Sequence, residues 1–241
     1  MTLILVGTGV SFDLTLAGLE AVRSCDEAFI ETYTNPMGDA DIAGLEKAAG
    51  KSIMKLGRDR LEGPYLVDKA RSGTICLLAS GDPLTATTHI TLVLEAKQKG
   101  VPIRVIHNSS IHSIAPARAG LQVYRFGKTA SLVNPRPNYK PTSSLDIIKE
   151  NLERDLHTLV LLDTEPSPME ASEALGMLSG FEKAIVLSRV GHEDERISCG
   201  TPATLRGTDL GRPPFCIIVP ARLHPVEEEF LESLIKDKGR L

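Results

Sequence analysis

The sequence predicts an α/β fold of two domains, residues 1–122 and 123–241, with a mostly parallel sheet in the first and a mixed sheet in the second. Short apolar runs alternate with amphipathic stretches through the first half, which is typical of strands joined by helices. A segment rich in proline and cations, residues 124–140, interrupts this pattern. Further apolar runs follow the interruption and predict a second domain.

The first domain should contain five strands. Leu16, Leu19 and Val22 recur at a spacing of three, which predicts a helix over residues 15–25. A second helix is expected over residues 85–99, because Gly100 is a natural C-terminal stop. A third helix should end at Gly120. The strands are expected at residues 3–6, 28–30, 52–56, 74–79 and 103–106.

The second domain repeats the alternation less regularly. Residues 197–205 contain Gly200 and Pro202, which favour a bent or edge segment. Helices are expected over residues 143–156 and 225–236. Strands are expected at residues 130–133, 158–163, 184–189 and 215–219.

Composition excludes several classes of function. The formal net charge is -4 and the pI is about 5.9, which argues against a function dominated by binding to a nucleic acid backbone but leaves a local basic patch open. The four cysteines form no C-x-x-C pair, so no metal site is expected. No apolar run reaches about 18 residues, the length of a membrane-spanning helix. We expect a cytoplasmic protein without a secretion signal.

The first candidate ligand contact is the segment Gly7-Thr8-Gly9-Val10 after the first strand. Ligands of open parallel sheets bind beyond the carboxyl ends of the strands. Glycines there allow a tight turn and close approach of a ligand, although packing alone explains them equally well. A dinucleotide fingerprint would need a third glycine at position 12, where Phe12 stands. In that reading Glu31 would bind the ribose.

The second candidate is Gly81-Asp82-Pro83, at the end of the fourth strand. A carboxylate at this position accepts hydrogen bonds from an amine or hydroxyl of a ligand. Alternatively, Asp82 or Thr85 caps the following helix, and both roles are compatible. His89 is a possible acid–base residue, but a histidine within a helix is more often a packing or surface residue.

The third candidate is the segment His107-Asn108-Ser109-Ser110-Ile111 after the fifth strand. Its serines and backbone N–H groups form a polar rim where a helix begins. They either hold the carboxylate of a ligand at the helix N-terminus or only cap that helix.

Together these segments resemble the diphthine synthases of the tetrapyrrole methylase superfamily. The G-x-G strand end, the G-D-P-L-x-A-T-T-H box and the I-H-x-x-S-I box occupy residues 6–10, 81–89 and 106–111. The G-D-P motif is shared with the wider superfamily, whereas A-T-T-H and the closing L-H-x-V-E-x-E segment are more specific. Further matches extend over essentially the whole chain, at residues 31–34, 121–128, 141–143, 148–151, 157–159 and 220–227.

The resemblance implies a tetrapyrrole methylase-like fold, in which two α/β domains enclose S-adenosylmethionine. It implies a homodimer that methylates the amino group of a modified histidine on translation elongation factor 2, during diphthamide biosynthesis. Position 215 is phenylalanine here, where relatives can carry histidine, so only a backbone contact to the adenine is expected. The cofactor contacts carried over by motif are Val10, Asp82, Thr85, Ser110, Ile111, Leu162, Val190 and Phe215.

The implied reaction does not require acid–base catalysis by a side chain. Methyl transfer from a sulfonium needs alignment of the reacting atoms, and water can take the proton of the acceptor amine, so we expect no indispensable catalytic base. A cluster of cations near the domain junction is interpreted as a solvated linker face, with docking of the protein substrate as the alternative. It comprises Arg118, Arg125, Lys128, Arg136 and Lys140.

Three alternative functions are compatible with parts of the pattern. A methylase of the same superfamily acting on a corrin precursor is disfavoured by the A-T-T-H box and the closing segment. An NAD-dependent dehydrogenase is disfavoured by Phe12. A non-catalytic nucleotide-binding module is the third alternative.

Overall fold

In the computed structural model, residues 1–33, 37–135, 142–165 and 167–236 are described. The chain divides into two compact units, Met1–Ile111 and His112–Leu241. The predicted domain division falls after residue 122, whereas the division between the two units falls after Ile111. Residues 34, 136, 140 and 141, which belong to predicted motifs or to the cation cluster, lie outside the described residues.

The first unit is built on a parallel sheet in the order β3-β2-β4-β1-β5. Its three central strands are buried on both faces, as expected where helices cover both sides of a parallel sheet. Each predicted strand of this half is present, which confirms the alternating pattern. The strands are β1 (Thr2–Gly7), β2 (Glu27–Glu31), β3 (Ile53–Leu56), β4 (Thr74–Ala79) and β5 (Ile103–Ile106).

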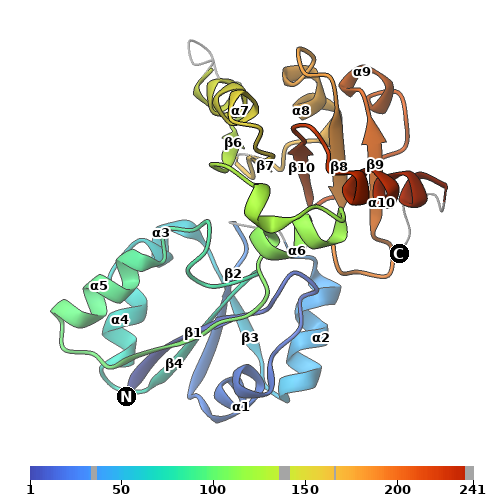
Figure 1. The fold of residues 1–241 in the computed structure, drawn as a ribbon. Helices are drawn as coiled ribbons and strands as arrows, with labels where there is room; N and C mark the ends of the chain where they lie inside the picture. Colours follow the sequence, from blue (N-terminus) through green and yellow to red (C-terminus); the bar gives the residue numbers. More distant parts are fainter. Residues whose placement is uncertain (34–36, 136–141, 166, 237–241) are drawn as a thin grey trace. The chain divides into compact units, whose positions relative to one another are not determined.

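Helices cover both faces of this sheet (Figure 1). On one face α1 (Leu16–Ser24) and α2 (Asp39–Ala49) pack against alternate residues of the strands, such as Ile4 and Leu78. On the other face α3 (Arg58–Leu61), α4 (Tyr65–Ala70) and α5 (Ile90–Gln98) pack against Leu5 and Leu77. The side chain of Thr15 caps α1 by accepting a hydrogen bond from Gly18.

The arrangement creates a topological switch point between β1 and β4. These strands are neighbours, yet α1, which follows β1, and α5, which follows β4, cover opposite faces of the sheet. Loops at such a point diverge and leave the carboxyl ends of the two strands available to a ligand. The predicted glycine-rich segment and the Gly81-Asp82-Pro83 segment are these two loops.

The helix predicted over residues 85–99 is wrong at its start, because α5 begins only at Ile90. The side chain of Asp82 binds the amide of Leu84 and the hydroxyl of Thr85, which holds this segment in a turn. Ala86 has a φ of 57°, which is incompatible with a right-handed helix. Neither Asp82 nor Thr85 therefore caps α5, whose N-cap position is His89.

The second unit contains a mixed sheet, as predicted, and its strands lie in the order β6-β7-β10-β8-β9. Only β6 and β7 are parallel, and the other pairs are antiparallel. β9 is an edge strand, and the helix α9 follows it, so the bent segment predicted over residues 197–205 is two elements. The strands are β6 (Ala130–Leu132), β7 (Thr158–Leu162), β8 (Ala184–Ser188), β9 (Arg196–Gly200) and β10 (Phe215–Val219).

The helices of the second unit include the two that the sequence predicts. Ile148, Leu175 and Leu205, one from each of α7, α8 and α9, pack against one face of the sheet. The helix α10 contacts β9. The elements are α6 (Ile111–Arg118), the 3-10 turn η1 (Val123–Arg125), α7 (Ser143–Glu153), α8 (Ala171–Met177), α9 (Pro202–Leu205) and α10 (Pro225–Lys236). No helix within the described residues is both long and apolar enough to cross a membrane.

Candidate active site

Three glycines bring the loops after β1 and β4 into direct contact. The amide of Gly9 donates to the carbonyl oxygen of Gly81 at 3.1 Å, and the amide of Gly81 donates to Gly9 at 3.0 Å. Gly9 and Gly81 have φ angles of +65° and +70°, which favour glycine. A Cβ atom on Gly7 would lie 2.5 Å from the oxygen of Gly81, so glycine is required there for close packing.

The loop after β5 contacts the loop after β1. The side-chain amide of Asn108 donates to the carbonyl oxygen of Gly7 at 3.0 Å and to that of Asp13 at 3.2 Å. The backbone amide of Val10 donates to Oγ of Ser109 at 3.1 Å. The three polar strand ends that the sequence singles out therefore lie together in the first unit.

Asp82 is the buried charge at this meeting point. Its Oδ1 accepts hydrogen bonds from the amide of Leu84 at 3.0 Å and from the hydroxyl of Thr85 at 3.1 Å. Its Oδ2 accepts from Nδ1 of His107 at 2.7 Å. A carboxylate offers about four acceptor positions, so these three bonds leave room for roughly one more donor.

The surroundings of Asp82 keep it ionised at neutral pH. Burial by itself would raise the pKa of this carboxyl group. The hydrogen bonds from Leu84, His107 and Thr85 outweigh burial and hold the pKa below the ordinary value. The loop therefore presents a fixed negative charge, which suits a cationic ligand or one that donates hydrogen bonds.

Ser110 and Ile111 follow directly in the same loop. Both are half-buried, and Ile111 is the first residue of α6. The side chain that binds Val10 is Ser109, one position before the predicted Ser110.

Three further candidate residues of the first unit are buried. Phe12 has a φ of 55° and is buried in the core beneath β1. Glu31 is buried, and its Oε2 accepts from the amide of Tyr33 at 3.1 Å. His89 is buried, and its Nδ1 lies 2.9 Å from the carbonyl oxygen of Pro83. Among the described residues its Nε2 has no hydrogen-bond partner.

The three predicted contacts of the second unit lie at the same end of three neighbouring strands of its sheet. β10 is antiparallel to β7 and β8, so the start of β10 meets the ends of the other two strands. Phe215 begins β10, Leu162 ends β7, and Val190 follows β8. The amide of Arg189 donates to the carbonyl oxygen of Pro214 at 3.0 Å, which fixes the two segments side by side.

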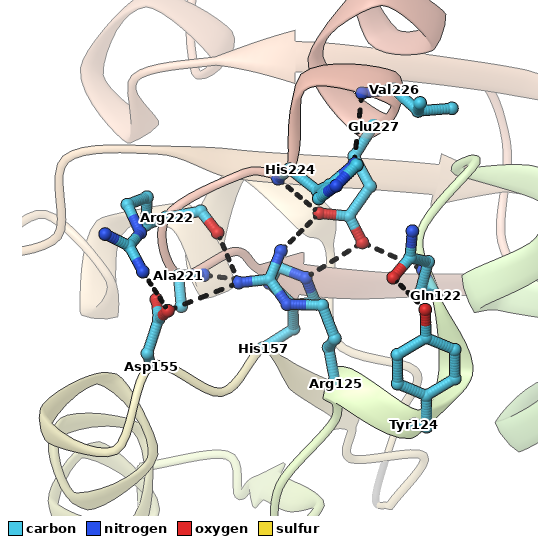
Figure 2. A network of polar contacts seen from close by, with 10 residues as sticks. All are labelled: Gln122, Tyr124, Arg125, Asp155, His157, Ala221, Arg222, His224, Val226 and Glu227. Carbon is cyan, nitrogen blue, oxygen red and sulfur yellow. Dashed lines mark hydrogen bonds and ion pairs between the residues drawn. The ribbon is translucent and has the colours of Figure 1, made fainter.

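The segments that carry the most specific motifs of the second half form a buried ion network (Figure 2). Glu227 in α10 is fully buried, and its Oε2 accepts from Arg125 at 2.6 Å. The amides of Gln122 and His224 donate to the same carboxylate at 2.9 and 2.8 Å. Arg125 also donates to the carbonyl oxygen of Arg222 at 2.7 Å.

His157 completes the network in a neutral form. Its Nδ1 accepts from the amide of Ala221 at 3.0 Å, so the ring proton lies on Nε2, which is 3.4 Å from Oε1 of Glu227. Burial lowers the pKa of His157. Burial would raise the pKa of Glu227, but the hydrogen bonds from the two amides and the charge of Arg125 hold it below the ordinary value. The network joins η1, β7 and α10 and leaves its buried groups paired.

Two of the five residues of the cation cluster form ion pairs in the second unit. The guanidinium of Arg118 forms an ion pair with the largely buried Glu195 at 2.5 Å, and Arg125 belongs to the network around Glu227. Both are fixed by acidic partners, so their interpretation as a solvated linker face is wrong. Lys128 is exposed, whereas Arg136 and Lys140 lie outside the described residues.

Sequence reasoning missed the roles of His107, Asn108 and Ser109. All three stand in the I-H-x-x-S-I box, which marked the segment correctly. Their individual bonds, to Asp82, Gly7 and Val10, join loops that are about 25 to 100 residues apart in sequence. A local pattern carries no signal for such pairings.

The comparisons with known proteins agree on one family. The sequence profile of the Tetrapyrrole (Corrin/Porphyrin) Methylases matches residues 2–205. The chain is 38% identical to a diphthine synthase of Methanothermobacter thermautotrophicus, over 96% of this chain and 95% of that one. It is also 38% identical to a diphthine synthase of Methanocaldococcus jannaschii, over 98% and 99% of the two chains.

Solved structures give the same result. A crystal structure of diphthine synthase has a TM-score of 0.88 and 34% identity, covering 97% of this chain and 95% of that chain. A crystal structure of a putative diphthine synthase from Entamoeba histolytica has a TM-score of 0.86 and 32% identity, covering 96% and 97%. This chain therefore belongs to the diphthine synthases, the methyltransferases of diphthamide biosynthesis, within the tetrapyrrole methylase family.

Proposed function

We propose that this chain transfers methyl groups from S-adenosylmethionine to the amino group of the modified histidine on translation elongation factor 2. Family membership supports methyl transfer in diphthamide biosynthesis. The observation that carries the proposal is the meeting of three loop ends around the ionised Asp82 at a topological switch point. Homodimer assembly stays a prediction from the resemblance.

The residues of the first unit fit this cofactor. A carboxylate with a remaining acceptor position suits the amine or hydroxyl groups of S-adenosylmethionine, and its charge suits the cationic sulfonium. Closely packed glycines let the backbone approach the ligand. In this proposal Val10, Ser110 and Ile111 bind through their backbone, while Asp82 and Thr85 bind from the loop after β4. Leu162, Val190 and Phe215 stay predicted contacts.

The bound cofactor would supply an activated methyl group, whose former partner leaves as a neutral thioether. The chain then has two tasks. It must align the acceptor nitrogen with the methyl carbon, an effect worth several kcal/mol, and it must hold a cation without offering a competing nucleophile. A carboxylate that already accepts three hydrogen bonds and a lining of backbone groups serve the second task.

A corrin or porphyrin precursor is the alternative substrate, since the matching family includes such methylases. The diphthine synthase relatives match nearly the whole chain, beyond the end of the family match at residue 205, and so favour the protein substrate. The segment beyond that point includes Glu227 and the rest of the closing motif.

The direct test is a transfer assay with methyl-labelled S-adenosylmethionine. We expect the label on elongation factor 2 that carries the diphthamide precursor, and no label on elongation factor 2 with the unmodified histidine. A parallel incubation replaces the protein with a corrin precursor. Label on the corrin precursor, or no transfer to either acceptor by a folded chain, would contradict the proposed function.

A further inference from the structure

His107 and Asp82 form a directed pair at the site. Nδ1 of His107 lies 2.7 Å from Oδ2 of Asp82, and the other oxygen of Asp82 is occupied by Leu84 and Thr85. The side chain of Asp82 is 9% exposed, whereas that of His107 is 66% exposed. The pair thus joins a buried carboxylate to a ring that reaches solvent from the loop after β5.

The contact with Asp82 decides where the proton of the imidazole lies. An ionised carboxylate only accepts hydrogen bonds, so Nδ1 of His107 must donate. In the neutral ring Nε2 then carries a lone pair and no proton. An orienting carboxylate behind a histidine is the arrangement by which proteins prepare a base.

We propose that His107 takes the proton from the acceptor amine before methyl transfer, with Asp82 as its positioning residue; this rests on the proposed function. An N–H bond of the acceptor ammonium breaks, its proton binds Nε2 of His107, and its electron pair stays on nitrogen. That pair forms the new nitrogen–carbon bond, while the pair of the carbon–sulfur bond remains with sulfur. The imidazolium then releases its proton to water.

Two other charged residues of the first unit lie near His107 in the chain or on a neighbouring loop. On the neighbouring loop after β1, Asp13 accepts a hydrogen bond from Asn108 at its backbone carbonyl, and its side chain is exposed. On the preceding strand, Arg104 is exposed. Asp82 is the charged group that the described structure places against the ring. This role of His107 differs from the sequence-based expectation that water can take the proton and that no base is indispensable.

The kinetic test compares wild type with His107→Ala and His107→Gln across pH, and Arg104→Ala serves as an exposed control on the same strand. Near pH 7 we expect both His107 variants to transfer methyl groups about 10²- to 10⁴-fold more slowly. The difference should shrink as pH rises, because the acceptor amine then loses its proton in solution. Cofactor affinity measured by calorimetry should stay unchanged.

A second readout does not depend on activity. ¹⁵N NMR of the imidazole in the intact protein should show the proton of neutral His107 on Nδ1, and Asp82→Ala should abolish this preference. A proton on Nε2 would overturn the proposal. So would a rate loss that is the same at every pH, or no loss at all, while wild type is active. A folded wild type that transfers no methyl group would instead refute the proposed function.

Discussion

Glu227→Ala should lower the free energy of unfolding by about 3–5 kcal/mol, the cost of removing one partner of a buried ion pair. The substitution leaves the guanidinium of Arg125, which is 17% exposed, without its 2.6 Å partner. It also leaves the amides of Gln122 and His224 without their acceptor. Because these groups come from η1 and from the segment before α10, the loss should loosen the attachment of α10.

Urea denaturation followed by circular dichroism measures this loss. The matched control is Glu228→Ala, which removes an exposed carboxylate from the adjacent residue of α10 and should change stability by less than about 0.5 kcal/mol. In a double-mutant cycle, Arg125→Ala and Glu227→Ala should be non-additive by about 0.5–3 kcal/mol. Similar free energies of unfolding for the Glu227 and Glu228 variants would show that the network contributes little to the stability of the fold.

Gly7→Ala should destabilise the first unit by about 1–3 kcal/mol and weaken cofactor binding, because the added methyl group has no space. Its Cβ would lie 2.5 Å from the carbonyl oxygen of Gly81, 2.9 Å from Cβ of Asn108 and 3.0 Å from Cδ of Pro83. The nearest of these atoms belongs to the backbone and cannot rotate away. The loops after β4 and β5 must therefore move apart, which separates the residues proposed to hold the ligand.

The same substitution at Gly44 is the control. Gly44 lies in the middle of α2, and a Cβ there would meet nothing within 4 Å. Gly44→Ala should stabilise the protein by about 0.5–1 kcal/mol, since alanine is the better helix former. The two variants should thus shift the thermal midpoint in opposite directions. A Gly7→Ala protein with wild-type stability and cofactor affinity would disprove the close packing of the three loops.

The sequence contained enough information to predict the strands and the loops that follow them. Apolar runs such as Thr74–Ala79 are long, buried on both faces and ended by turn residues, so their limits are set locally. The helices α2, α3, α4, α8 and α9 were not predicted. α3 and α4 have only four and six residues, too few to show a helical period.

Tertiary contacts decide what the sequence pattern could not. The side chain of Asp82 holds residues 82–85 in a turn by binding Leu84 and Thr85, so α5 begins later than the sequence pattern predicts. Arg125 and Glu227 stand 102 residues apart, so no local pattern indicates that they form an ion pair. Their pairing depends on η1 and α10 meeting in the folded chain, a property that no local spacing encodes.

Isothermal titration calorimetry tests the central claim, that the loop ends around Asp82 bind S-adenosylmethionine. Wild type should bind the cofactor, and a folded Asp82→Ala protein should bind it roughly 10- to 100-fold more weakly, because a hydrogen bond to a charged group contributes about 1.5–3 kcal/mol. Asp13→Ala removes an exposed carboxylate from the neighbouring loop and should bind like wild type. Equal affinity in the wild-type and Asp82→Ala proteins would contradict this account of the site.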